Sequence, residues 1–126
     1  MHTLTPRQLA DLVCRSAAGY YPSEAAARLL VDHDRWLHRH DFTATCVEYD
    51  HDGSAPIAWV DWQAIPAFVE HAACSSSEAR ILRLAAELAG VDTGTPLADL
   101  LSGLDATNIR LVLHAIGHVL TQGGRR

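Results

Sequence analysis

The sequence predicts a single α+β domain over residues 1–126, in which five or six helices pack around one short antiparallel β-hairpin. Apolar residues recur at helical spacing along most of the chain. The exception is the window 42–60, where two runs of β-branched and aromatic residues flank an Asp-Gly pair. With 126 residues, 48% of them hydrophobic and 20% charged, the chain is long and apolar enough for one core.

Two helices are expected before the hairpin. Thr5 serves as the N-cap of the first, Pro6 suits its first position, and Gln8 completes a capping box. Gly19 and Pro22 mark its end. A second helix is expected from a cap at Ser23 to about residue 38 or 40. Its apolar stripe would be formed by Ala26, Leu29, Leu30, His33, Trp36 and Leu37.

The hairpin is predicted from residues 42–49 and 56–60, joined by a turn-rich loop over 50–54. Two strands alone are marginally stable in water, so this hairpin must pack against the helices.

Helical patterns return after the hairpin. Asp61 can open a segment that runs to about residue 73, although Pro66 restricts its regular part to the residues that follow it. Ser75 and Glu78 form a capping box for a helix that ends near residues 89–90. A short helix is expected after Thr95-Pro96. Asp105 caps the last helix, whose buried stripe would be Ile109, Val112, Leu113, Ile116, Val119 and Leu120.

The charge of −5 is unevenly distributed. Residues 32–61 hold seven acidic residues and two arginines, and the remainder of the chain is neutral. Six of the eight aromatic residues fall within 36–68. Exposed Trp side chains are typical anchors of protein interfaces. The sequence therefore favours a non-enzymatic protein-binding or accessory module that binds a protein partner or a second copy through segment 32–62, with Trp59, Trp62, Asp50 and Asp52 as candidate contacts.

An alternative is a metal-dependent enzyme that uses His33, Asp34, His38 and His40. Imidazole and carboxylate groups bind zinc and similar ions, but this spacing matches no closed structural motif. The competing interpretation pairs Asp34 with His38 across one helical turn and makes His33 a hydrogen-bonded core histidine. No cofactor is predicted, because no dinucleotide or phosphate-binding glycine motif is present.

A second form of this alternative is a reactive thiol at Cys74. This residue precedes a helix N-terminus, which lowers a thiol's pKa, and His71 lies three residues upstream as a candidate base. The competing interpretation is a half-buried apolar cysteine. The three cysteines are odd in number and widely spaced, which indicates a reducing compartment, the cytoplasm.

A third interpretation is a DNA-binding regulator in which residues 77–126 form a helix-turn-helix variant. Arg80, Arg83 and Arg110 would supply its cations. A sequence pI near 5.8 does not provide the basic face that binding to phosphates requires, so nucleic acid is the less favoured partner. No apolar run is long enough for a membrane helix, and the N-terminus shows no secretory signal.

Three stretches, Gly19-Tyr20-Tyr21-Pro22, residues 77–86 and residues 102–108, resemble small uncharacterised proteins of GC-rich actinobacteria. The absence of lysine among the ten basic residues agrees with such a genome. The resemblance implies a bacterial cytoplasmic protein. It carries no activity and no site residues.

Overall fold

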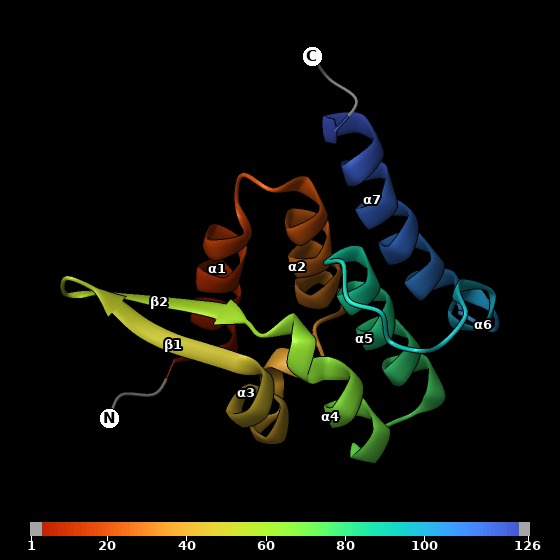
Figure 1. The fold of residues 1–126 in the computed structure, drawn as a ribbon, viewed down its shortest axis with the longest axis horizontal. Coiled ribbons are helices and arrows are strands. Elements are labelled where there is room, and N and C mark those ends of the chain that lie inside the picture. Colours follow the sequence, from red (N-terminus) through yellow and green to blue (C-terminus); the bar gives the residue numbers. More distant parts are fainter. Residues whose placement is uncertain (1–3, 124–126) are drawn as a thin grey trace.

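The fold is a layer of helices with a β-hairpin extending from one side (Figure 1). The computed structural model describes residues 4–123. The predominantly helical α+β class is confirmed. The elements are α1 (Pro6–Ala17), α2 (Tyr21–His33), η1 (Trp36–His38), α3 (His40–Cys46), β1 (Val47–Asp52), β2 (Ala55–Val60), η2 (Trp62–Ala64), α4 (Ile65–His71), α5 (Ser76–Leu88), α6 (Leu97–Leu101) and α7 (Ala106–Gly123).

Three of the expected capping signals locate helix starts accurately. The Thr5 hydroxyl accepts from the Gln8 backbone N–H and the Gln8 side chain accepts from Thr5, so the expected capping box opens α1. Ser75 and Glu78 form the same reciprocal pair at the start of α5. The Asp105 carboxylate accepts the backbone N–H of Asn108 at 2.8 Å and caps α7.

The expected helix from residue 23 to 38 or 40 is wrong at both ends. Pro22 lies in the first turn of α2, where its missing N–H has no cost, so the helix starts at Tyr21. The helix stops at His33 because Asp34 adopts a left-handed conformation with φ 57° and ψ 43°. A short 3-10 turn, η1, follows, and the chain changes direction into α3.

The expected strand over 42–49 is also corrected, because residues 40–46 are helical. Phe42 and Cys46 are four residues apart and both fully buried, which is the spacing of one face of α3. The strand begins only at Val47 and pairs antiparallel with β2 from Val47↔Val60 to Asp52↔Ala55. Gly53, at φ 67°, and Ser54 form the two-residue turn.

An aromatic cluster joins α3 and α4 to η1. Trp36 is fully buried, and its ring centroid lies 5.8 Å from that of Phe42 and 5.9 Å from that of Phe68. The indole Nε1–H donates to the backbone carbonyl of Glu78 at 3.2 Å, which ties η1 to the first turn of α5. The Arg39 guanidinium lies 4.8 Å from the Trp36 ring centroid on the outside.

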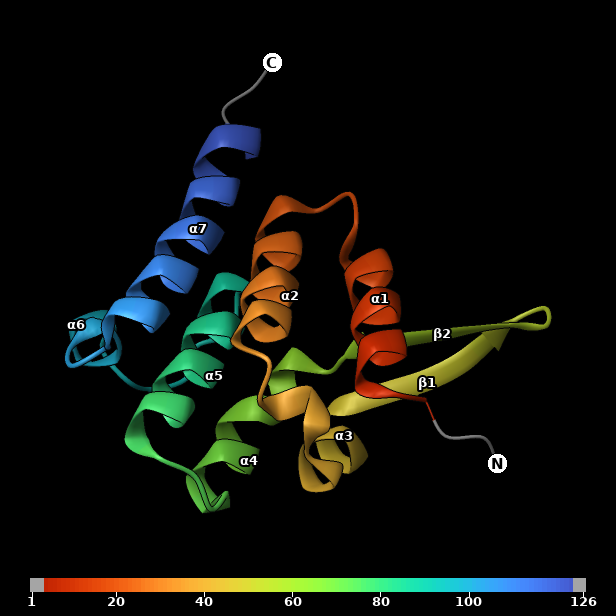
Figure 2. The same ribbon diagram turned by 180° about the vertical axis from the view of Figure 1, so that it is seen from behind.

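Two apolar clusters form the core, and α2 and α5 contribute to both. The first lies among α1, η1, α3, α4 and the base of the hairpin, and the second lies among α2, α5, α6 and α7. From behind, α2 and α5 are seen between the hairpin side and α7 (Figure 2). No helix within residues 4–123 is long and apolar enough to cross a membrane.

Helix α7 packs on the core through one side of the predicted stripe, where Val112 is buried and Ile116 and Val119 are partly buried. Val112 and Ala115 are buried, but Ile109, Leu113 and Leu120 are 44%, 63% and 69% exposed. The predicted buried stripe is therefore wrong for these three residues.

We predict that Trp36→Phe lowers the free energy of unfolding by about 1–3 kcal/mol, because it removes the bond to Glu78 and leaves a void in the cluster. Urea unfolding measures the change. Trp59→Phe, at an exposed indole, is the matched control and should change stability by less than about 0.5 kcal/mol. Equal losses of stability in both variants would contradict the conclusion that Trp36 ties η1 to α5.

Candidate functional site

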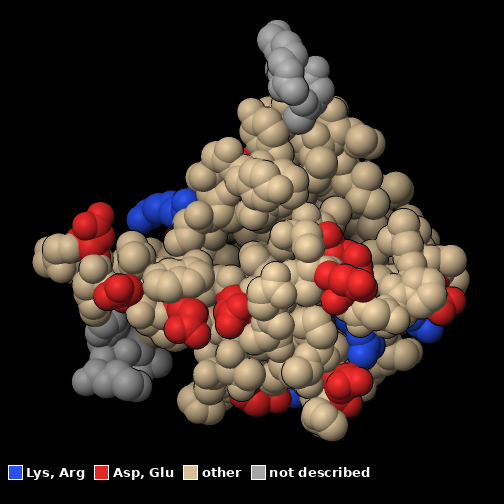
Figure 3. All heavy atoms as spheres, in the orientation of Figure 1, with Lys and Arg blue, Asp and Glu red and all other residues tan. Residues whose placement is uncertain are grey.

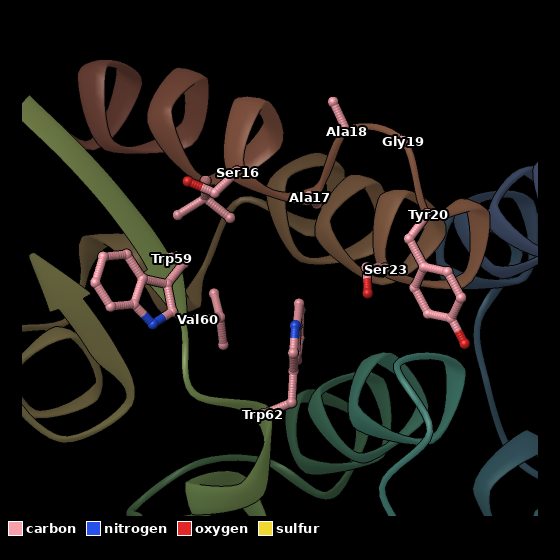
Figure 4. Close-up of a pocket in the computed structure, with 10 residues that line it drawn as sticks. Ser16, Ala17, Ala18, Gly19, Tyr20, Ser23, Trp59, Val60 and Trp62 are labelled. Atoms are coloured by element: carbon pink, nitrogen blue, oxygen red, sulfur yellow. The ribbon is translucent and has the colours of Figure 1, made fainter. Parts of the chain in front are cut away.

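A shallow groove of about 340 Å³ lies between the α1–α2 connection and the end of β2 (Figure 4). Trp59 and Tyr20 lie at its two ends, and Trp62 lies between them opposite Ala17. Backbone atoms of Gly19 and the hydroxyls of two serines complete the polar part of the wall. The lining residues are Val13, Ser16, Ala17, Ala18, Gly19, Tyr20, Ser23, Trp59, Val60 and Trp62.

The outer face of the hairpin carries a row of carboxylates beside a row of apolar side chains. Cross-strand partners share a face, and alternate residues point the same way. The register pairs Glu48 with Trp59, Asp50 with Ile57, and Asp52 with Ala55, so all six lie on one face. The opposite face carries the buried Val47, Ala58 and Val60 and packs on α1. In Figure 3 acidic side chains gather along the hairpin.

The structure divides the aromatic residues of segment 32–62 between core and surface. Trp36 and Phe42 are fully buried. Trp59 is 38% exposed, Tyr49 is 51% exposed, and Trp62 is partly exposed in the groove. The candidate protein-binding residues Trp59, Trp62, Asp50 and Asp52 therefore all reach the surface, whereas the helical part of the segment serves the core.

Sequence patterns missed the far wall of the groove. Tyr20 is 62% exposed and lies across from β2 because α1 and α2 form an antiparallel pair. The available signal was the Gly19-Tyr20 pair in a tight connection: Gly19, at φ 100°, turns the chain there.

A single carboxylate holds this wall in place. Glu24 accepts the Gly19 backbone N–H on one oxygen at 2.7 Å and contacts His118 Nε2 of α7 with the other oxygen at 2.7 Å. The Gly19 N–H and then His118 keep the pKa of Glu24 below its ordinary value.

The four candidate metal ligands do not converge. Within the described part of the chain, no group of three or more His, Cys, Asp or Glu side chains is placed to hold a metal ion. Asp34 and His38 form an exposed pair, with Oδ1 and Nε2 2.7 Å apart. His33 is buried on α2, and His40 is exposed at the first residue of α3.

His33 is buried, with 8% of its surface exposed, and its Nδ1 atom has no hydrogen-bond partner in the structure. The sequence favoured a core histidine whose polar atoms are hydrogen-bonded. The burial of His33 agrees with this expectation, whereas the unpaired Nδ1 atom does not. Burial, and then the charge of Arg35, lower the pKa of His33. The neutral imidazole is the form that this site accepts.

The sequence predicts that the helix N-terminus lowers the pKa of the Cys74 thiol, but in the structure this pKa is raised. Burial, followed by the nearby Glu78 carboxylate, raises the pKa of Cys74, and these effects outweigh the lowering by Arg39 and Arg83. The thiol is therefore protonated at neutral pH. His71, the candidate base, is exposed at the last residue of α4.

The C-terminal helices lack a basic face in the part that the structure describes. Over residues 106–123, α7 carries one arginine, Arg110. Arg80 lies against Gly103, where an added Cβ would come within 3.2 Å of the guanidinium. The arginines at 125 and 126 lie outside the described residues.

Comparison with known proteins found no match to this chain among protein families, curated proteins or solved structures.

We predict that His33→Leu raises the free energy of unfolding by about 1 kcal/mol at pH 7.5, because it removes an unpaired buried polar atom. The gain should be larger at pH 5.5. A folded-state pKa below 6.5 means that the unfolded chain takes up the proton first, so wild-type stability falls as pH drops below 6.5.

Urea unfolding at the two pH values tests this prediction. His40→Gln, at an exposed histidine, is the control and should change the free energy of unfolding at pH 7.5 by less than about 0.5 kcal/mol. If the stability of His33→Leu had the same pH dependence as that of wild type, the conclusion that protonation of His33 destabilises the fold would be contradicted.

Proposed function

We propose that this chain is a non-enzymatic protein-binding module that takes an extended, basic segment of a partner protein along its hairpin and into the adjoining groove. The observation that carries the proposal is the position of Trp59. It is the last exposed residue of the apolar row on the hairpin and also lines the groove. The two features therefore form one continuous surface.

Charge complementarity supports a basic partner. Glu48, Asp50 and Asp52 occupy alternate positions of β1, so their carboxylates repeat about every 6.6–6.8 Å along one face. An extended peptide presents its alternate side chains at the same repeat. Arginine or lysine at alternate positions would therefore face all three carboxylates, and such complementarity sets specificity and association rate.

The groove supports an extended occupant. Aromatic-lined grooves bind segments in the polyproline II conformation, because rigid rings pack on an already extended backbone at low entropic cost. Trp59, Trp62 and Tyr20 supply such rings here, and Ser16 and Ser23 supply hydroxyls beside them. The Ser16 hydroxyl donates to the Ala58 carbonyl at 2.6 Å, so its oxygen keeps lone pairs for a peptide N–H.

We predict that panning random linear peptides displayed on phage against the protein enriches sequences with alternating Arg or Lys next to Pro or aliphatic residues. Synthetic versions of the enriched peptides should bind Trp59→Ala at least about tenfold more weakly than wild type, because an interface anchor is lost. Isothermal titration calorimetry measures the affinities.

The double variant Asp50→Asn/Asp52→Asn should weaken binding at low salt and abolish most of its salt dependence. Its matched control, Glu70→Gln/Asp99→Asn, removes two exposed acids from α4 and α6 and should bind as wild type does. Tyr49→Ala, on the opposite face of the hairpin, is the control for Trp59→Ala. Failure to enrich peptides, or equal losses in variants and controls, would refute the proposal.

A further inference from the structure

One aromatic ring of the groove offers a flat face to a ligand. In Figure 4 the indole of Trp62 is seen edge-on, with one face turned toward the side on which Ser23 and Tyr20 lie. Trp62 is partly exposed, and its indole N–H has no hydrogen-bond partner within residues 4–123. The part of the groove between Trp62 and Tyr20 can therefore hold a planar group against a ring.

The backbone beside this ring offers acceptors and no unused donors. Helix α1 ends at Ala17, so the groove wall contains the C-terminal end of a helix, which favours cations. The N–H groups of Ala18, Gly19 and Tyr20 are all engaged in hydrogen bonds. Within the described part of the chain, the carbonyl of Ser16 accepts none. This wall complements a ligand group that is rich in N–H donors.

The charges around the groove also favour a cation. None of the lining residues is charged. The Glu24 carboxylate lies directly behind the wall, with one oxygen 2.7 Å from the Gly19 nitrogen. The carboxylates of β1 share the face of the hairpin that carries Trp59. Arg15 precedes Ser16 on α1 but does not line the groove. A positively charged ligand group would therefore meet carboxylates nearby and no cation in the lining.

We propose that the groove anchors the partner segment through one arginine, whose guanidinium stacks on Trp62 beside Tyr20 and donates to the acceptors at the end of α1. A guanidinium is planar, weakly hydrated and rich in N–H donors, so it can cover an aromatic face and bond to the wall with its edge. A lysine ammonium is compact and strongly hydrated, and it fits this site less well. Arg39 makes a contact of this kind over Trp36 in the same protein.

This inference rests on the proposed function, because it names the side chain of the partner segment that enters the groove. The site itself can be tested without a partner peptide. N-acetyl-arginine methylamide, titrated into isotope-labelled wild type, should shift the indole N–H signal of Trp62 in two-dimensional NMR spectra, with a dissociation constant of about 1–10 mM. The citrulline derivative, which has a similar shape and no charge, should bind at least about tenfold more weakly.

Variants of the two rings locate the bound guanidinium. Tyr20→Leu and Trp62→Leu should each weaken binding of the arginine derivative about threefold or more, because each removes an aromatic contact. Tyr49→Leu removes another exposed tyrosine, outside the groove, and should bind as wild type does. Trp62 also packs against both core clusters, so circular dichroism must show that its variant is folded. Tyr20 is 62% exposed, and its variant keeps the test valid if Trp62→Leu does not fold.

Citrulline scanning of the peptides that bind along the hairpin completes the test. At one arginine, replacement by citrulline should lower the affinity at least about tenfold, and this loss should shrink in Tyr20→Leu, because the two changes affect one contact. A shift of the Trp62 signal by the arginine derivative would support the arginine site even in the absence of any enriched peptide, a result that would refute the proposed function alone.

Two results would overturn the inference. The first is an arginine derivative that leaves the Trp62 signal unchanged, or shifts it no more than the citrulline derivative does. The second is a set of peptides that bind to the hairpin and groove but tolerate citrulline at every arginine in turn. That second result would leave the proposed function in place, with an uncharged residue in the groove.

Discussion

The burial of Trp36 is the constraint on which the arrangement of the other elements depends. Its indole is enclosed by Phe42 and Phe68 and bonded to the Glu78 carbonyl, so one side chain joins η1, α3, α4 and α5. If one helix continued through residues 23–40, Trp36 would project from the end of α2 and not from a separate turn. The left-handed residue Asp34 ends α2 and turns the chain before Trp36, at a conformational cost that burial of a large aromatic side chain offsets.

This turn also places the hairpin and α7 on opposite sides of the helical layer (Figure 1). Because α3 follows η1 in a new direction, the hairpin extends from the side of the layer that lies away from α7 (Figure 1). The hairpin carries carboxylates and Trp59 of the groove, whereas α7 carries exposed aliphatic side chains and little charge. The proposed peptide surface and the exposed apolar side chains of α7 are therefore distinct in place and in chemistry.

Local signals in the sequence predicted the features that local interactions determine. The capping boxes at Thr5 and Ser75 each depend on two residues that are three positions apart. The predictions from sequence were wrong where tertiary packing determines the secondary structure or the buried face of an element. Residues 42–46 have strand-like composition, but burial of Phe42 and Cys46 on one face makes them helical. The exposure of Ile109, Leu113 and Leu120 depends on how α7 is placed against α2, which no pattern within α7 contains. Likewise, Tyr20 lines the groove only because α1 pairs with α2.

The Glu24 carboxylate has a consequence for communication across the molecule. One of its oxygens holds the Gly19 N–H in the groove wall, and the other contacts His118 on α7, so the two regions share a single polar joint. A ligand that moved Gly19 would change the bond geometry at Glu24 and thereby the energy of its contact with α7. A ligand in the groove and a change at α7 would therefore act on the same carboxylate.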